Sequence, residues 1–152
     1  MRYFTVFALL LGVLVSAGWT SALAENKVSA NLCIEYSGTF IWDEPNPDIQ
    51  NMRVRFSSIN YGLQGQITAS GTVYYNINGE LSSSETRVEI DRNTLRFEMW
   101  EKSDNNPDFV SDGSHVGKIA ADLSQVNAVW TTRSNGETGK LKLKALDACL
   151  AQ

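Results

Sequence analysis

Hydrophobic and polar residues alternate along most of the chain from residue 29 onward, and this period of two predicts β-strands. The clearest case is the run 140–145, in which Leu141, Leu143 and Ala145 alternate with three lysines. Such a run is typical of an antiparallel strand with one face buried and one face in water. We therefore expect an antiparallel sheet that is covered on one side only.

The same pattern predicts eight or nine strands in succession, because the run 66–78 fits either one bent strand or two. Asn78-Gly79 is the strongest turn signal, since both residues tolerate positive φ. No segment has the periodicity of an amphipathic helix. The fold class predicted is all-β: a single-domain, antiparallel up-and-down β-barrel of about eight strands, with a β-sandwich as the alternative. The expected strands cover residues 29–42, 52–59, 66–78, 86–91, 94–101, 115–123, 126–133 and 140–149.

The first 24 residues are predicted to be a cleaved signal peptide. Arg2 supplies a positive start, Phe4 to Val15 is an apolar run too short to span a bilayer, and Ala22-Leu23-Ala24 fits a cleavage site. We expect residues 25–152 to form the mature domain, located in the periplasm or secreted, with no membrane insertion.

The chain has two cysteines, Cys33 and Cys149, which lie near the two ends of the predicted domain. In an exported protein such a pair is expected to form one disulfide. This bond would tie the first strand to the last, which favours a closed barrel. In the chain-entropy model a loop of this size contributes roughly 4–5 kcal/mol to stability.

Charge and motif content argue against several classes of function. The formal net charge is −4, and no basic patch with interleaved aromatic residues occurs along the sequence, so nucleic-acid binding is not expected. His115 is the only histidine and is predicted to lie on the surface beside a turn. No G-x-S-x-G motif is present, so we expect neither an enzyme nor a cofactor or metal site.

The carboxylates are candidates both as metal ligands and as catalysts. Asp104, Asp108 and Asp112 form an oxygen-rich loop that matches no calcium-binding pattern, and the favoured interpretation is a solvated loop. The strand residues Glu35, Glu98 and Glu101 are predicted to face outward, as strand acids commonly do.

The aromatic residues are the best candidates for a binding site. Most are expected to be core residues, but tryptophan and tyrosine also suit ligand contact because each combines a flat apolar ring with one hydrogen-bond donor. The residues predicted to contact a ligand at a barrel mouth are Tyr36, Trp42, Trp100 and Trp130.

The chain resembles the avidin- and lipocalin-type barrels in two places. Gly38-Thr39-Phe40 lies where those families carry G-x-W near the first strand, with Phe40 in place of the tryptophan. Asn127 to Trp130 is similar to the N-x-x-W pattern of the penultimate avidin strand, and Glu137 falls near an acid of that family. The resemblance implies a barrel in which Trp130 contacts the bound ligand.

Two functions are predicted. The first is a non-enzymatic exported protein that binds a small apolar or aromatic ligand at the barrel mouth. The second is a protein-binding module that inhibits an exported hydrolase, such as lysozyme or a protease, through the acidic loop bearing Asp43, Glu44 and Asp48. The partner is accordingly a small molecule or another exported protein.

Overall fold

The structure is a computed structural model, and it describes residues 31–45, 47, 49–77, 79–102 and 112–146. The predicted signal peptide, Asp48 and Cys149 lie outside these ranges. The predictions made for them are therefore not tested by the structure.

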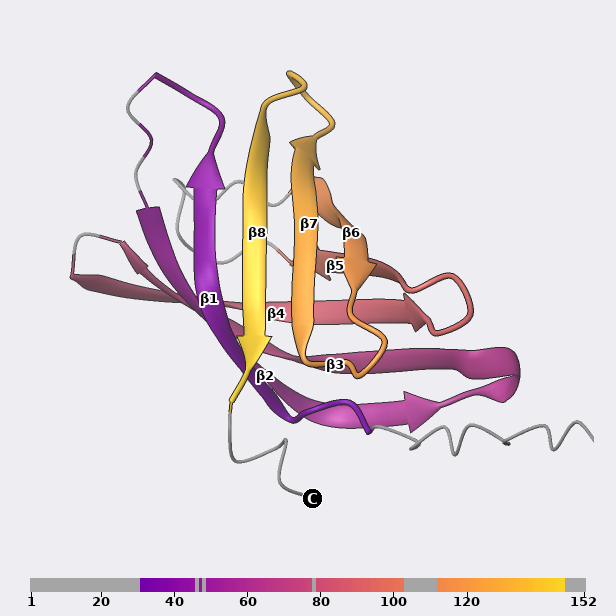
Figure 1. The fold of residues 1–152 in the computed structure, drawn as a ribbon. Helices are drawn as coiled ribbons and strands as arrows, with labels where there is room; N and C mark the ends of the chain where they lie inside the picture. The colour runs from indigo at the N-terminus through magenta and orange to yellow at the C-terminus, as the bar shows by residue number, and fades with distance from the viewer. Residues whose placement is uncertain (1–30, 46, 48, 78, 103–111, 147–152) are drawn as a thin grey trace, which may run out of the picture.

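The described residues form one closed, eight-stranded barrel in which each strand pairs antiparallel with its neighbours in sequence (Figure 1). β1 also pairs antiparallel with β8, and this pairing closes the barrel. The prediction of an up-and-down barrel is confirmed, and the alternative of a β-sandwich is wrong. A short 3₁₀ turn, η1 (Leu63–Gly65), joins the second and third strands. The strands are β1 (Glu35–Trp42), β2 (Ile49–Tyr61), β3 (Gln66–Ile77), β4 (Glu80–Asp91), β5 (Arg96–Glu101), β6 (Gly113–Ile119), β7 (Gln125–Thr132) and β8 (Thr138–Ala145).

The alternating pattern assigns most faces correctly. In β8, Leu141, Leu143 and Ala145 are buried while the lysines between them are exposed, as predicted. In β7, alternate residues from Val126 to Thr132 are likewise buried. Ile34 has the same parity as the buried Tyr36, but it is 57% exposed because β1 begins only at the next residue.

The run 66–78, which fits either one bent strand or two, forms the single strand β3, and it pairs with an irregular part of β2. The β2–β3 register shifts between Phe56 and Ser58, which is the signature of a β-bulge. A Cβ atom on Gly71 would lie 2.0 Å from the backbone oxygen of Arg55. Only glycine allows this close approach of the two backbones, which helps the sheet to curve into a barrel.

The barrel is filled at the end where the chain enters β1. There the Tyr36 hydroxyl donates to the backbone oxygen of Leu123 at 2.6 Å, and both residues are almost fully buried. The void among the side chains around them measures only about 10 Å³. A packed interior of this kind leaves no room for a ligand in this half of the barrel.

Tyr36 makes a testable contribution to stability at alkaline pH. Burial raises the pKa of its hydroxyl from 10.0 to about 12. Above pH 10 the unfolded chain loses this proton while the folded protein keeps it, so stability falls as pH rises, by up to about 1.4 kcal/mol per pH unit. We expect Tyr36→Phe to be less stable than the wild type at pH 8 and the gap to shrink between pH 10 and pH 12. Urea unfolding at each pH measures this gap.

A matched variant, Tyr74→Phe, alters an exposed tyrosine. Its difference from the wild type is measured over the same pH interval as the reference for removing an exposed tyrosine hydroxyl. A gap for Tyr36→Phe that stays constant up to pH 12 would contradict the raised pKa.

Candidate functional site at the barrel mouth

The opposite end of the barrel, which we call the mouth, is where β1 and β7 end and β8 begins (Figure 1). Trp42 and Trp130 both pair with Gly139, which lies on the strand between them. Because Gly139 has no side chain, the two indole rings meet above it, edge to face, with centroids 4.9 Å apart. A Cβ atom on Gly139 would lie 2.2 Å from the ring of Phe40, so the glycine also makes room for that ring.

Phe40 links this tryptophan pair to the only histidine of the chain. Its ring centroid lies 5.0 Å from that of Trp42 and 5.7 Å from that of His115, both in edge-to-face contacts. The His115 ring also lies against Trp130, at 6.4 Å between centroids. The prediction that His115 lies on the surface is wrong: the residue is 2% exposed.

A buried polar network adjoins the aromatic cluster. His115 Nε2 lies 2.9 Å from Glu101 Oε1, and the Tyr75 hydroxyl donates to the same oxygen at 2.5 Å. The side chains of His115 and Glu101 are only 3% and 7% exposed. Burial, together with the nearby Glu101 carboxylate, raises the pKa of Tyr75 well above its ordinary value. Tyr75 therefore remains a neutral hydrogen-bond donor at physiological pH.

One atom of this network has no hydrogen-bond partner within the described part of the chain. His115 Nδ1 is buried and makes no hydrogen bond among the described residues. Leaving a buried polar atom unpaired costs about 1–3 kcal/mol, so folded proteins leave few such atoms without a partner. A bound ligand with one hydrogen-bonding group would supply the missing partner.

Two further buried hydroxyl groups near the mouth are bound to the backbone. The hydroxyls of Ser84 and Thr86 donate to the backbone oxygens of Lys102 and Trp100, respectively. Within the described ranges no group of three or more metal-ligating side chains occurs. Of the predicted oxygen-rich loop, Asp104 and Asp108 lie outside those ranges, while Asp112 accepts a hydrogen bond from the Ser134 N–H.

The structure brings together two of the four predicted ligand residues, Trp42 and Trp130. Tyr36 lies at the filled end of the barrel, away from this pair. Trp100 points to the outside of β5, where it lines a hollow of about 530 Å³ with Arg87 and Lys102. Alternation explains this, because Met99 and Glu101 on either side of Trp100 face the interior.

The acidic loop predicted for partner binding begins beside the mouth. Asp43 accepts hydrogen bonds from Lys140 Nζ at 2.6 Å and from the Thr138 hydroxyl at 2.8 Å. These contacts, with that of Lys140 the largest, lower the pKa of Asp43. Glu44 is exposed, and Asp48 lies outside the described residues.

Sequence reasoning missed Glu101, His115 and Gly139. Glu101 was predicted to face outward, yet it shares its parity in β5 with the buried residues Phe97 and Met99. His115 likewise shares its parity in β6 with buried Ile119. Applying the alternation strictly, polar residues included, would have placed both side chains inside the barrel.

These features define a class of protein: a closed, eight-stranded up-and-down barrel with an aromatic and polar mouth at one end. The layout is compatible with that of the lipocalin- and avidin-type barrels. Neither a protein-family model nor a curated protein sequence matches this chain. No helical segment within the described ranges has the length and hydrophobicity that crossing a bilayer requires.

Proposed function

We propose that this protein is an exported, non-enzymatic binding protein that takes a small apolar or aromatic ligand at the barrel mouth. The observation that carries the proposal is the buried Nδ1 of His115, which has no hydrogen-bond partner among the described residues and lies within an aromatic cluster. A ligand with a flat apolar body and one polar group fits both features.

The aromatic cluster supports the apolar part of this ligand. Trp42 is only half-buried, whereas Trp130 is 5% exposed. A ligand that packs against Trp42 would cover its exposed ring surface and extend the edge-to-face contacts already present. The interior is filled at the end where the chain enters β1, so the ligand is limited to the mouth.

Export and the disulfide complete the proposal. Export rests on the signal-like sequence of residues 1–24. The disulfide between Cys33 and Cys149 is supported by the burial of Cys33 and by the backbone N–H of Leu146, which donates to Glu35 O. The chain therefore leaves β8 close to Cys33 and three residues before Cys149.

Native mass spectrometry of the protein, purified gently from its own exported compartment, tests the proposal. We expect a small-molecule adduct that is lost on denaturation. Trp42→Ala should reduce the fraction of protein that carries this adduct at least 10-fold, because the exposed face of Trp42 is the proposed contact. Trp100→Ala is the matched control, since this tryptophan lies outside the barrel, and it should retain the adduct. Equal retention by wild type, Trp42→Ala and Trp130→Ala would contradict the proposed site.

A second function is favoured by one observation: the interior of the barrel is filled at the end opposite the mouth. A packed barrel with acidic residues beside its mouth suits a module that inhibits a basic exported hydrolase. The same mass measurement separates the two functions. A protein that carries no adduct and binds an exported hydrolase in a pull-down would favour the inhibitor.

A further inference from the structure

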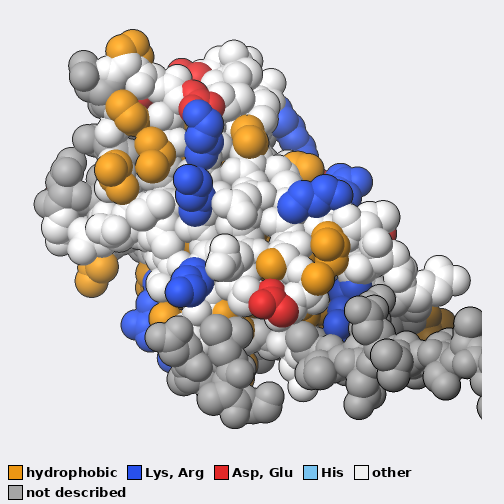
Figure 2. All heavy atoms as spheres, in the orientation of Figure 1, with side chains coloured by type: hydrophobic (Ala, Val, Ile, Leu, Met, Phe, Trp, Pro, Cys, Tyr) orange, Lys and Arg blue, Asp and Glu red, His pale blue; other side chains and the backbone are white. Residues whose placement is uncertain are grey.

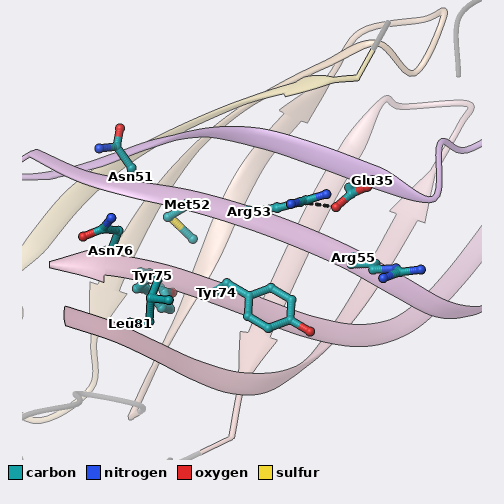
Figure 3. Close-up of a pocket in the computed structure, with 9 residues that line it drawn as sticks. All are labelled: Glu35, Asn51, Met52, Arg53, Arg55, Tyr74, Tyr75, Asn76 and Leu81. Carbon is teal, nitrogen blue, oxygen red and sulfur yellow. Dashed lines mark hydrogen bonds and ion pairs between the residues drawn. The ribbon is translucent and has the colours of Figure 1, made fainter. Parts of the chain in front are cut away.

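A groove of about 380 Å³ runs over the outer surface of the barrel (Figure 3). It crosses the first four strands of the sheet. Arg53, Arg55 and Tyr74 lie along it in the close-up, with Asn51 and Asn76 toward one end. The full lining is Glu35, Asn51, Met52, Arg53, Arg55, Tyr74, Tyr75, Asn76 and Leu81.

The strand register arranges the outward side chains of the groove in successive pairs. Asn51 is opposite Asn76, and Arg53 is opposite Tyr74. Arg55 follows on the same face of β2, so three levels of polar side chains are spaced about 6.8 Å apart along the strands. The groove thus presents an extended row of contacts rather than a single point.

Hydrogen-bond donors dominate this row. Arg53 is paired with Glu35, but Arg55 is exposed and has no ion pair among the described residues. The side-chain oxygen of Asn76 already accepts the N–H of Gly79 at 3.0 Å, which leaves its NH₂ group to face a ligand. The Tyr74 ring is 42% exposed and offers a flat apolar surface between the polar groups.

The surrounding surface is positive although the chain as a whole is acidic. Lys142 and Lys144 of β8 lie across β1 from the groove, opposite Thr39 and Ser37. Figure 2 shows Lys and Arg side chains spread over this face with few acidic ones among them. On the described outward positions of β8, β1, β2 and β3, Glu35 is the only carboxylate; β4 carries three outward ones, of which Glu85 and Glu89 are paired with Lys102 and Arg87. The local field therefore attracts anions.

We infer that this groove binds a short acidic oligosaccharide that carries carboxylate groups. Arg55 holds a carboxylate through paired N–H donors, a geometry that suits guanidinium well. The Tyr74 ring packs against the apolar face of a sugar ring, and the NH₂ of Asn76 donates to sugar hydroxyls. This site lies on the outer surface of the barrel, and its occupation does not depend on the function proposed above.

The closed barrel favours a saccharide over an extended peptide. Peptides that bind to sheets commonly add a strand to an exposed edge and take most of their affinity from backbone hydrogen bonds. The β1–β8 pairing removes such an edge from this barrel. Recognition in the groove is left to side chains, namely planar polar groups and an aromatic face.

Isothermal titration calorimetry of the purified protein with trigalacturonic acid, in about 0.15 M salt, tests the inference. Maltotriose, which is neutral and of similar length, is the comparison ligand. We expect the acidic trisaccharide to bind, and the neutral one to bind at least 10-fold more weakly. Arg55→Ala and Tyr74→Ala should each reduce the affinity for the acid at least 10-fold.

Two control variants distinguish binding in this groove from binding elsewhere on the protein. Arg87→Ala removes an exposed arginine outside the groove, and Trp42→Ala alters the mouth; each should change the affinity less than 2-fold. If Arg55→Ala and Arg87→Ala reduce the affinity for the acidic trisaccharide equally, the protein binds it through overall positive charge and not in the groove, which would overturn the inference. The inference would also be overturned if Trp42→Ala lost affinity for the acidic trisaccharide or if the wild type did not bind it. Tighter binding of a single-stranded oligonucleotide than of the trisaccharide would overturn it as well.

Discussion

Glu101→Ala is expected to lower the free energy of unfolding by about 3 kcal/mol. The substitution removes the oxygen shared by Tyr75 and His115, and both partners are almost fully buried. Each buried polar group that loses a hydrogen-bond partner costs up to about 1–3 kcal/mol. Urea unfolding at pH 7, followed by circular dichroism, measures the change.

Two further substitutions on β5 make this result specific to the buried network. Glu101→Gln keeps the length of the side chain and one accepting oxygen, so its cost should be smaller. Glu98→Ala removes a carboxylate that contacts Arg96 on the outer face at 2.6 Å, and surface ion pairs contribute only about 0–1 kcal/mol. If Glu101→Ala costs no more than Glu98→Ala, the buried network does not stabilise the mouth.

Removal of the proposed disulfide is expected to lower the free energy of unfolding by as much as Glu101→Ala does, or by more. Replacement of Cys33 and Cys149 together by alanine should lower the free energy of unfolding by about 4 kcal/mol. The physical reason is that the bond closes a loop of nearly the whole domain and so restricts the unfolded chain. Urea unfolding of the oxidised wild type and of the double variant measures the difference.

Reduction of the wild type supplies the control for this prediction. A reducing agent should lower its stability to within about 1 kcal/mol of the double variant, the remainder being the lost burial of the Cys33 side chain. Detection of two free thiols in the untreated, denatured protein would show that the bond does not form.

The sequence predicts the barrel because alternation is a local property of each strand. The faces of β8 follow directly from it, as Leu141 shows. The interior position of His115 and Glu101 was missed because each was assigned by its polarity instead of its parity. Their contact needs the pairing of β5 with β6, which no local pattern specifies.

The groove was harder to predict still, because it depends on the register between two strands. Near η1, Tyr61 pairs with Ile67, but the bulge after Phe56 shifts the pairing by one residue. That shift places Tyr74, rather than one of its neighbours, opposite Arg53. A bulge leaves little signal in a single sequence, so the composition of the groove could not be predicted.

The closure of the barrel by β1 and β8 also bears on how the chain folds. This pairing joins the most distant strands, so its loop-closure entropy is large, and it is favoured only after the intervening hairpins have formed. Until then both strands are open edges, which are prone to pair with other chains. The lysines that alternate with Leu141 and Leu143 oppose such aggregation by mutual repulsion, so the same residues that make the surface basic protect the chain while it folds.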